Sequence, residues 1–218
     1  MRKLHQFLSV FLSFFYPVRV RKGSSKENPV LELYLYRNRW QLATADALYS
    51  DGDKYRPLVV AFKELEDKLP AVKKVLVLGA GLGSAVNVLH SKGYSPEVTL
   101  VDNDKLVLQW ALEMLGDKAA NNVRPVCDDA QSFVQKNEQQ YDLVIIDIFN
   151  GRLVPEFVTK AYFLQQCRHS VYSGGHVVFN YIVNHPKQWD DTRDIFNAVF
   201  PINKVVKNDT NRILIATV

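Results

Sequence analysis

The chain has 218 residues, of which 47% are hydrophobic and 23% are charged. These values are typical of one globular domain with a small appendage, and they exclude a disordered chain, a collagen-like chain and a long coiled coil. Two cysteines are too few for a disulfide framework, and the sequence has no Cys/His cluster with metal-site spacing. No apolar run reaches the ~20 residues of a membrane-spanning helix. We therefore expect a cytoplasmic protein without a transmembrane segment or a metal.

Positive charge is concentrated at the start of the chain. Residues 1–40 contain eight Lys or Arg and two Asp or Glu, whereas residues 41–218 contain 19 and 21. The body of the protein is therefore close to neutral and lacks the basic face that nucleic-acid binding requires. We expect no nucleic-acid partner.

An aromatic, apolar stretch, residues 4–18, follows the basic residues Arg2 and Lys3. It is similar in composition to a signal peptide, but the bulky and basic residues 16–19 do not provide a small-residue cleavage site. Its apolar residues recur at helical spacing, which predicts a short helix that packs on the domain or on a partner. Contact with a membrane surface is the alternative, and a homodimer formed through the N-terminal region is one arrangement that the sequence allows.

Two strands are predicted next, over residues 30–36 and 39–43, because both segments are rich in residues that favour strands. Arg37 and Asn38 connect them, so we expect a small β-hairpin that acts as a lid. A helix is predicted over residues 55–69, with Pro57 in its first turn. We assign the N-terminal helix and the hairpin to residues 1–53 and the main domain to residues 54–218.

From residue 74 onward, short apolar strands alternate with helices, which predicts parallel βαβ units. The expected fold class is α/β, a Rossmann-like, seven-stranded, mostly parallel sheet with helices on both faces, preceded by the β-hairpin. In such sheets, ligands bind beyond the carboxyl ends of the strands. The expected strands cover residues 75–78, 98–101, 123–126, 143–146, 176–183, 204–206 and 212–218, and the expected helices cover 105–115, 130–136, 156–169 and 190–199.

A glycine-rich loop follows the first of these strands and opens a helix. Glycines at Gly79, Gly81 and Gly83 allow close approach of a ligand to the backbone, and the helix start offers free N–H groups. A dinucleotide fingerprint would need glycine or alanine at Ser84. The observed spacing favours a nucleoside with a short charged tail, and a tight strand-to-helix turn without a ligand is the alternative.

Carboxylates follow the next two strands. At the end of the second, Asp102 is suited to accept hydrogen bonds from two ribose hydroxyls, while Asp104 is predicted to cap the next helix. After the third strand, Asp128 and Asp129 precede Ala130. An aspartate there can accept a hydrogen bond from the adenine amine or cap the helix, and the sequence leaves both roles open.

Asp147 ends the fourth strand, whose other residues from Leu143 onward are apolar. A carboxylate at this position is best explained by a cationic ligand beside it, so Asp147 is our candidate catalytic residue. All four signals follow successive strands and therefore meet at one edge of the sheet. This shared location is more specific than any single motif.

Residues 76–181 resemble the class I S-adenosylmethionine-dependent methyltransferase fold, and within it the spermidine synthases and their shorter relatives. The resemblance implies that the donor is S-adenosylmethionine or its decarboxylated form and that Gln41 contacts it. It assigns the same donor site to Gly79, Gly81, Gly83, Asp102, Asp129 and Ala130. The similar segments are 77–84, 100–104, 129–130 and 141–147, with Phe163, 174–175 and 177–180 further on and 39–42 and 49–52 upstream.

The chain departs from the spermidine synthase pattern at the acceptor end. Spermidine synthases have a second aspartate three residues after the catalytic one, where this chain has Asn150, and their acidic residue after the hairpin tyrosine is not reproduced by Tyr49-Ser50. A diamine needs carboxylates at both ends of its pocket. Asp51 and Asp53 are the possible replacements.

The leading hypothesis is a transferase that moves an aminopropyl or a methyl group to a small acceptor, with an amine as the favoured class. Asp147 orients the acceptor in this hypothesis. Methyl transfer without a polyamine role stays open, as does a nucleoside-binding protein without catalysis. An NAD-dependent oxidoreductase is a third class, which Ser84 and Asp129 disfavour.

Overall fold

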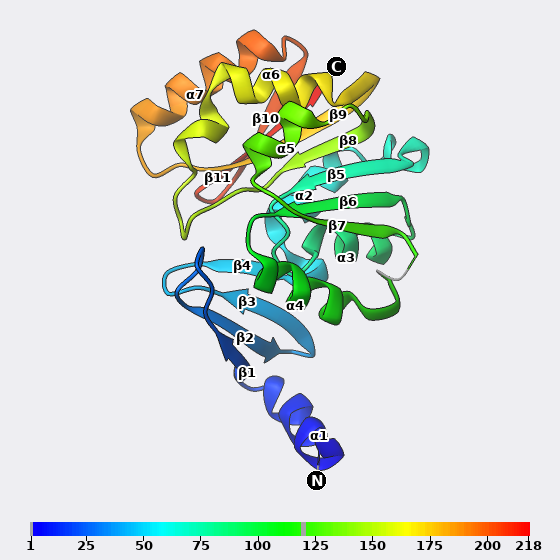
Figure 1. The fold of residues 1–218 in the computed structure, drawn as a ribbon, viewed down its shortest axis with the longest axis vertical. Helices are drawn as coiled ribbons and strands as arrows, with labels where there is room; N and C mark the ends of the chain where they lie inside the picture. Colours follow the sequence, from blue (N-terminus) through cyan, green and yellow to red (C-terminus); the bar gives the residue numbers. More distant parts are fainter. Residues whose placement is uncertain (1, 119–120) are drawn as a thin grey trace.

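The computed structural model describes residues 2–118 and 121–218, and these residues form a helix, a small antiparallel sheet and an α/β domain (Figure 1). The small sheet has the order β1-β2-β3-β4, and the large sheet has seven strands in the order β10-β11-β9-β8-β5-β6-β7. Its helices cover both faces. The expected fold class is therefore confirmed.

The small sheet contains the predicted hairpin, with two more strands at its edges. The hairpin is β2 (Leu31–Tyr36) and β3 (Arg39–Ala43). Arg37 and Asn38 have φ of 49° and 58°, as expected in a tight two-residue hairpin turn. β1 (Val18–Gly23) and β4 (Leu48–Asp51) complete the sheet. The sequence did not indicate β1 because four of its six residues are exposed and three are basic, nor β4, which is short.

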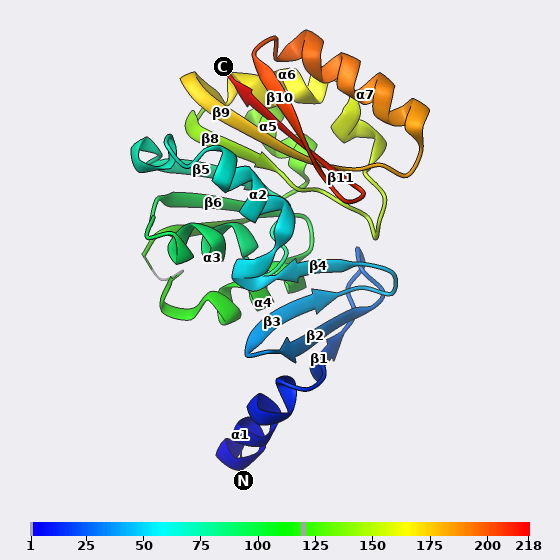
Figure 2. The same cartoon turned by 180° about the vertical axis from the view of Figure 1, so that it is seen from behind.

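The first helix, α1 (Arg2–Ser13), extends away from the α/β domain beyond the small sheet (Figures 1 and 2). Its end is fixed to the hairpin turn, where the backbone N–H of Arg37 donates to the Ser13 carbonyl oxygen at 2.7 Å. Leu8, Phe11 and Phe14 are each more than half exposed. The helix itself is confirmed, and a homodimer through this region stays a prediction. Among residues 2–118 and 121–218, no helix is long and apolar enough to span a membrane.

Five adjacent strands of the large sheet, β9-β8-β5-β6-β7, are parallel, as the alternation of strands and helices predicted, and β11 is antiparallel to both of its neighbours. The seven strands of this sheet start and end within a few residues of the expected bounds, except β9. This strand begins five residues early and passes through Gly174 at φ 82°. The strands are β5 (Lys74–Leu78), β6 (Glu97–Asp102), β7 (Val123–Cys127), β8 (Tyr141–Ile146), β9 (Val171–Ile182), β10 (Asn203–Asn208) and β11 (Asn211–Thr217).

Alternate residues of the buried strands face two separate cores. Val75 and Val77 of β5 pack with α2, α3 and α4, whereas Leu76 and Leu78 pack with α5, α6 and α7. Figure 2 shows α2 and α3 on one face of the sheet, and Figure 1 shows α5, α6 and α7 on the other. The helices are α2 (Arg56–Glu64), α3 (Ser84–Ser91), α4 (Lys105–Leu115), α5 (Ala130–Lys136), α6 (Ala161–His169) and α7 (Pro186–Val199).

Two expected helices are shorter than predicted. The helix predicted over 55–69 ends at Glu64, and a separate turn of 3-10 helix covers Leu69–Ala71. The α-helix ends because its C-cap residue, Leu65, has φ −109° and ψ 13°, outside the helical region. The helix predicted over 156–169 is divided into a 3-10 helix, Glu156–Thr159, and α6, because Lys160 between them has extended backbone angles. The division of the chain at residue 53 stays a prediction.

Candidate active site

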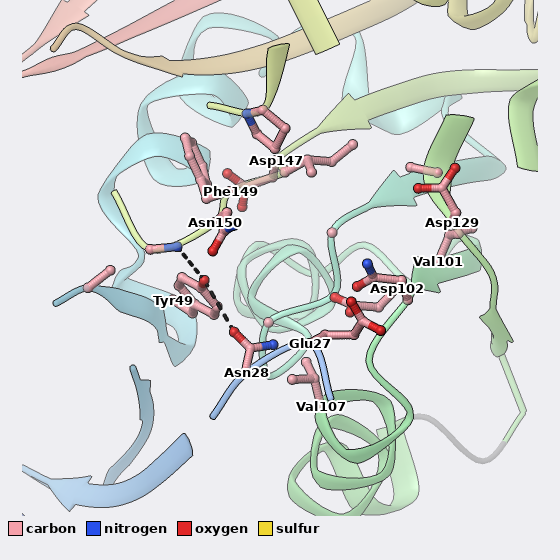
Figure 3. A pocket seen from close by; sticks show the side chains of 18 of the residues that line it. Glu27, Asn28, Tyr49, Val101, Asp102, Val107, Asp129, Asp147, Phe149 and Asn150 are labelled. Carbon is pink, nitrogen blue, oxygen red and sulfur yellow. Dashed lines mark hydrogen bonds between the residues drawn. The ribbon is translucent and has the colours of Figure 1, made fainter. Parts of the chain in front are cut away.

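A cavity of about 240 Å³ lies where the carboxyl ends of β5, β6, β7 and β8 meet the small sheet (Figure 3). Its lining includes Gly79 after β5, Asp102 at the end of β6, Asp129 after β7 and Asp147 after β8. The four signals read from the sequence therefore converge on one cavity. Residues of β4 and of the β1–β2 loop line it from the other side.

The glycine loop has no room for side chains at the two positions that line the cavity. Gly79 has φ +95°, and a Cβ there would collide with the backbone carbonyl of Asp147. Gly81 has φ +49°, and a Cβ there would lie 3.0 Å from the carbonyl oxygen of Tyr49. The third glycine, Gly83, is not among the lining residues. A Cβ on it would meet Leu115 of α4 at 2.6 Å, so Gly83 allows α3 to pack closely on α4.

Asp102 holds the loop and faces the cavity. Its two carboxylate oxygens accept hydrogen bonds from the backbone N–H groups of Ala80, at 2.8 Å, and Asp104, at 2.9 Å. Burial raises the pKa of Asp102 to about 6, against the opposing effect of these two hydrogen bonds. Each oxygen has a second lone pair for a ligand donor, so the geometry fits two adjacent hydroxyl groups.

The predicted cap at Asp104 is confirmed, because its side chain accepts hydrogen bonds from the N–H groups of Leu106 and Val107. The second carboxylate oxygen of Asp104 accepts from the hydroxyl of Ser25 and from the Asn28 amide, the latter at 2.7 Å. These bonds fix the β1–β2 loop over α4. They bring Glu27 and Asn28 to the cavity, which the sequence did not indicate.

Asp129 has one of the two roles that the sequence left open for its position, the helix cap, and the adenine contact stays a prediction. Its side chain caps α5 by accepting a hydrogen bond from the N–H of Ser132 at 2.9 Å, and the residue also lines the cavity with Ala130. Asp128 accepts from the N–H of Asp129. A second acceptor oxygen on Asp129 is thus available to a ligand amine.

Asp147 is held by two neutral donors. Its Oδ1 accepts hydrogen bonds from the Asn180 amide at 2.7 Å and from the Tyr55 hydroxyl at 3.2 Å. The amide of Asn211 donates in turn to Oδ1 of the fully buried Asn180 at 2.7 Å, which directs the Asn180 amino group at Asp147. Burial raises the pKa of Asp147 to about 6, and the two hydrogen bonds oppose the rise. Burial also raises the pKa of Tyr55, so this hydroxyl is a neutral donor.

The structure does not bring Gln41 to the cavity. Its amide donates to Asp51 at 2.8 Å across the β3–β4 pair, and Gln41 is not among the lining residues. Asp51 also lies 3.6 Å from Arg39. Asp53 is paired with Lys54 and borders a different hollow beside α3. Neither of the two aspartates that we considered as replacements therefore faces Asp147.

The charged lining is entirely acidic within the part of the chain that the structure describes. Glu27, Asp102, Asp129 and Asp147 line the cavity, and none of the lining residues is Lys, Arg or His. Such a site favours cations, because an anion would find no opposite charge there. In residues 2–118 and 121–218, no group of three or more His, Cys, Asp or Glu is arranged to hold a metal ion.

Comparisons with known proteins agree with this architecture. A polyamine aminopropyltransferase of Vibrio vulnificus is 26% identical over 134 residues, which cover 60% of this chain and 44% of that protein. An N-terminal histidine N-methyltransferase of Emericella nidulans is 28% identical over 116 residues, 51% of this chain and 20% of that protein. The chain thus spans less than half the length of either relative.

Among solved structures, a probable spermidine synthase from Corynebacterium glutamicum superposes with a TM-score of 0.75 at 17% identity, covering 93% of this chain and 80% of that one. This likeness establishes the shared fold. Residues 55–207, more than half of the chain, match the spermine/spermidine synthase domain. The chain therefore belongs to the spermine/spermidine synthase family.

Proposed function

We propose that the protein transfers an aminopropyl group from decarboxylated S-adenosylmethionine to a small amine. The observation that carries this proposal is the cavity at the carboxyl edge of the sheet, whose charged lining consists of four carboxylates. The donor carries a sulfonium and an ammonium group, and the acceptor amine is also cationic at neutral pH. Family membership and the aminopropyltransferase relative support the same activity.

The donor fits the half of the cavity formed by β5, β6 and β7. Asp102 would accept hydrogen bonds from the ribose hydroxyls, and Asp129 with Ala130 would receive the adenine. Gly79 and Gly81 have no side chains at the part of the cavity wall where the donor tail would pass. A donor contact by Gln41 would require it to leave Asp51 and stays a prediction.

Asp147 is the group that would act on the acceptor. The donor supplies an electrophilic carbon bonded to sulfonium sulfur. The acceptor ammonium first loses a proton, and a carboxylate with a pKa of about 6 is suited to accept it near neutral pH. The lone pair of the neutral nitrogen then forms a bond to that carbon, while the carbon–sulfur bond breaks and leaves its electron pair on sulfur. Tyr55 and Asn180 keep that carboxylate oriented by hydrogen bonds to Oδ1.

Methyl transfer is the second candidate. The Emericella nidulans relative is named as an N-methyltransferase, and an amine can accept a methyl group by the same in-line displacement. Positioning of donor and acceptor is the main contribution of the protein in either reaction. A cytoplasmic location, the absence of a nucleic-acid partner and a homodimer belong to the proposal on sequence grounds alone.

Product analysis tests the proposal and separates the two reactions. The full chain is incubated with an amine mixture and either S-adenosylmethionine or its decarboxylated form. Aminopropyl transfer releases methylthioadenosine, whereas methyl transfer releases S-adenosylhomocysteine. Absence of both products, in a protein that still binds the donors, would contradict the proposal and leave a nucleoside-binding protein without catalysis.

We expect Asp102→Ala to weaken adenosyl-ligand binding at least tenfold. The variant loses two charge-assisted hydrogen bonds to ribose, each worth ~1.5–3 kcal/mol. Calorimetry with S-adenosylhomocysteine and with its 2′,3′-dideoxyribose analogue isolates this contact from the support that Asp102 gives the glycine loop. The wild type should bind S-adenosylhomocysteine more tightly than the dideoxy analogue, and the variant should bind both with equal affinity. If both proteins distinguish them equally, the ribose is bound elsewhere.

A further inference from the structure

Charge is divided unevenly across the cavity. On the side of β6 and β7 lie Asp102 and Asp129, and Glu27 joins them from the β1–β2 loop (Figure 3). On the side of β8 and β9, Asp147 is the one charged residue of the lining that the structure describes. The glycine loop after β5 separates the two sides, because β5 lies between β8 and β6 in the sheet. We call them the β6–β7 half and the β8–β9 half.

The remaining wall of the β8–β9 half is apolar or uncharged. Besides Asp147, its polar side chains are the uncharged Asn150, Tyr49 and Tyr55. The Tyr49 hydroxyl accepts a hydrogen bond from the N–H of Gly151 at 2.7 Å, which ties this wall to β4. The apolar members of the wall are Leu48, Ile148, Phe149, Pro155, Phe157 and Ile182.

A second carboxylate is absent from this half among the described lining residues. Asp51 is engaged by Gln41 and Arg39, and Asp53 borders another hollow. Asp46 is a further acid, and it lies beside the lining residue Gly151. Its carboxylate packs against Gly151, where a Cβ would lie 2.5 Å from it, but Asp46 is solvent-exposed and is not among the lining residues.

From this division we propose that the acceptor is a primary monoamine with an apolar or aromatic substituent, and not a diamine. The inference rests on the proposed transferase function and names its acceptor class. The amine would lie at Asp147, and the substituent would lie against Phe149, Phe157 and Ile182.

The physical reason is the cost of placing a second ammonium group in the apolar part of the β8–β9 half. An ion that leaves water without an opposite charge loses solvation that an uncharged wall does not replace. Burial of an alkyl or aryl group against the same wall is favourable, since the group is removed from water. The two effects favour a monoamine over a diamine of equal length.

The matched pair n-butylamine and 1,4-diaminobutane tests the proposal, with phenethylamine as an aromatic acceptor. Thioether product is measured with each amine at saturating donor. We expect kcat/KM to be ~100-fold higher for n-butylamine than for 1,4-diaminobutane, and phenethylamine to be used as well. Equal or better use of the diamine would overturn the proposal while leaving the transferase function intact.

Two variants locate the effect. Asn150→Asp adds a carboxylate to the β8–β9 half, so the diamine-to-monoamine ratio of kcat/KM should rise at least ~10-fold. Asp46→Asn should leave that ratio unchanged. A ratio that falls in Asp46→Asn would show that Asp46 serves the second ammonium, and it would overturn the proposal.

Binding is measured separately, so that failure of the transferase function is distinguishable. Each amine is titrated into protein saturated with methylthioadenosine. Stronger binding of n-butylamine supports the acceptor class even if no product forms, in which case the transferase function fails alone. Stronger binding of the diamine contradicts the acceptor class.

Discussion

Asp147→Asn is expected to lower the turnover number by ~100-fold or more while donor affinity changes only modestly. Asparagine keeps the shape of the side chain and can still accept hydrogen bonds from Asn180 and Tyr55. It loses the negative charge and the ability to accept a proton, which are the properties that general-base catalysis needs. Asp102 and Asp129, which would bind the donor substrate, are unchanged. Steady-state kinetics and donor calorimetry measure the two effects separately.

The pH profile adds a signature specific to this carboxylate. Because the pKa of Asp147 is raised to about 6, the base is protonated at lower pH, and wild-type activity should rise as pH increases through about 6. A bound cationic amine stabilises the carboxylate and moves this limb to lower pH in kcat than in kcat/KM for the acceptor. At saturating donor, the limb in kcat should be absent from the residual activity of Asp147→Asn.

Stability provides the folding control for the same variant. A carboxyl whose pKa is higher in the folded than in the unfolded protein destabilises the fold when it is ionised, and this cost decreases as pH falls from about 6 toward the ordinary pKa of 3.8. At pH 7, Asp147→Asn should therefore melt at the same temperature as the wild type or higher. Equal turnover of the two proteins would remove Asp147 from the mechanism.

Gly81→Val should abolish donor binding. The valine would have to adopt φ +49°, and its Cβ would lie 3.0 Å from the Tyr49 carbonyl oxygen, so the glycine loop or β4, which both line the cavity, would have to shift. Gly93→Val is the matched control, since Gly93 also has a positive φ, +86°, but nothing lies within 4 Å of its Cβ position. Both variants carry backbone strain of ~1–3 kcal/mol. Only Gly81→Val should lose the ligand.

Calorimetry with S-adenosylhomocysteine measures the outcome, and circular dichroism confirms that both variants are folded. Retained binding in folded Gly81→Val would mean that the loop is a structural turn without a ligand role. Loss of binding in both variants would show that backbone strain in α3 and its connections causes the effect.

The sequence was sufficient for the large sheet and for the acids at its edge. Strands such as β5 and β8 are buried on both faces, so their residues form unbroken apolar runs, and the residue after each run is placed by the sheet itself. Asp102 and Asp147 could be predicted for this reason. β7, the strand before Asp129, is partly exposed, and Asp129 was placed at the edge by the alternation of strands and helices. The cap was assigned to Asp104 because this residue directly precedes a predicted helix.

Two of the missed residues, Tyr55 and Glu27, line the cavity, and a third, Asn180, donates a hydrogen bond to Asp147. Tyr55 precedes α2, Asn180 is a buried polar residue of β9, and Glu27 lies in a loop fixed by Asp104. A buried asparagine in an apolar strand is the one sequence signal that could have indicated Asn180, because buried polar groups need partners. Gln41 was assigned from family resemblance alone, and its position follows from pairing with Asp51 on the neighbouring strand.

The measurement that tests the central claim most directly is titration calorimetry of the full chain with five ligands. They are S-adenosylmethionine, decarboxylated S-adenosylmethionine, S-adenosylhomocysteine, methylthioadenosine and NAD. The acidic cavity and the short glycine loop predict binding of the adenosyl-sulfur ligands, with the decarboxylated donor bound more tightly than S-adenosylmethionine, and no binding of NAD. Binding of NAD, without binding of any adenosyl-sulfur ligand, would contradict the account.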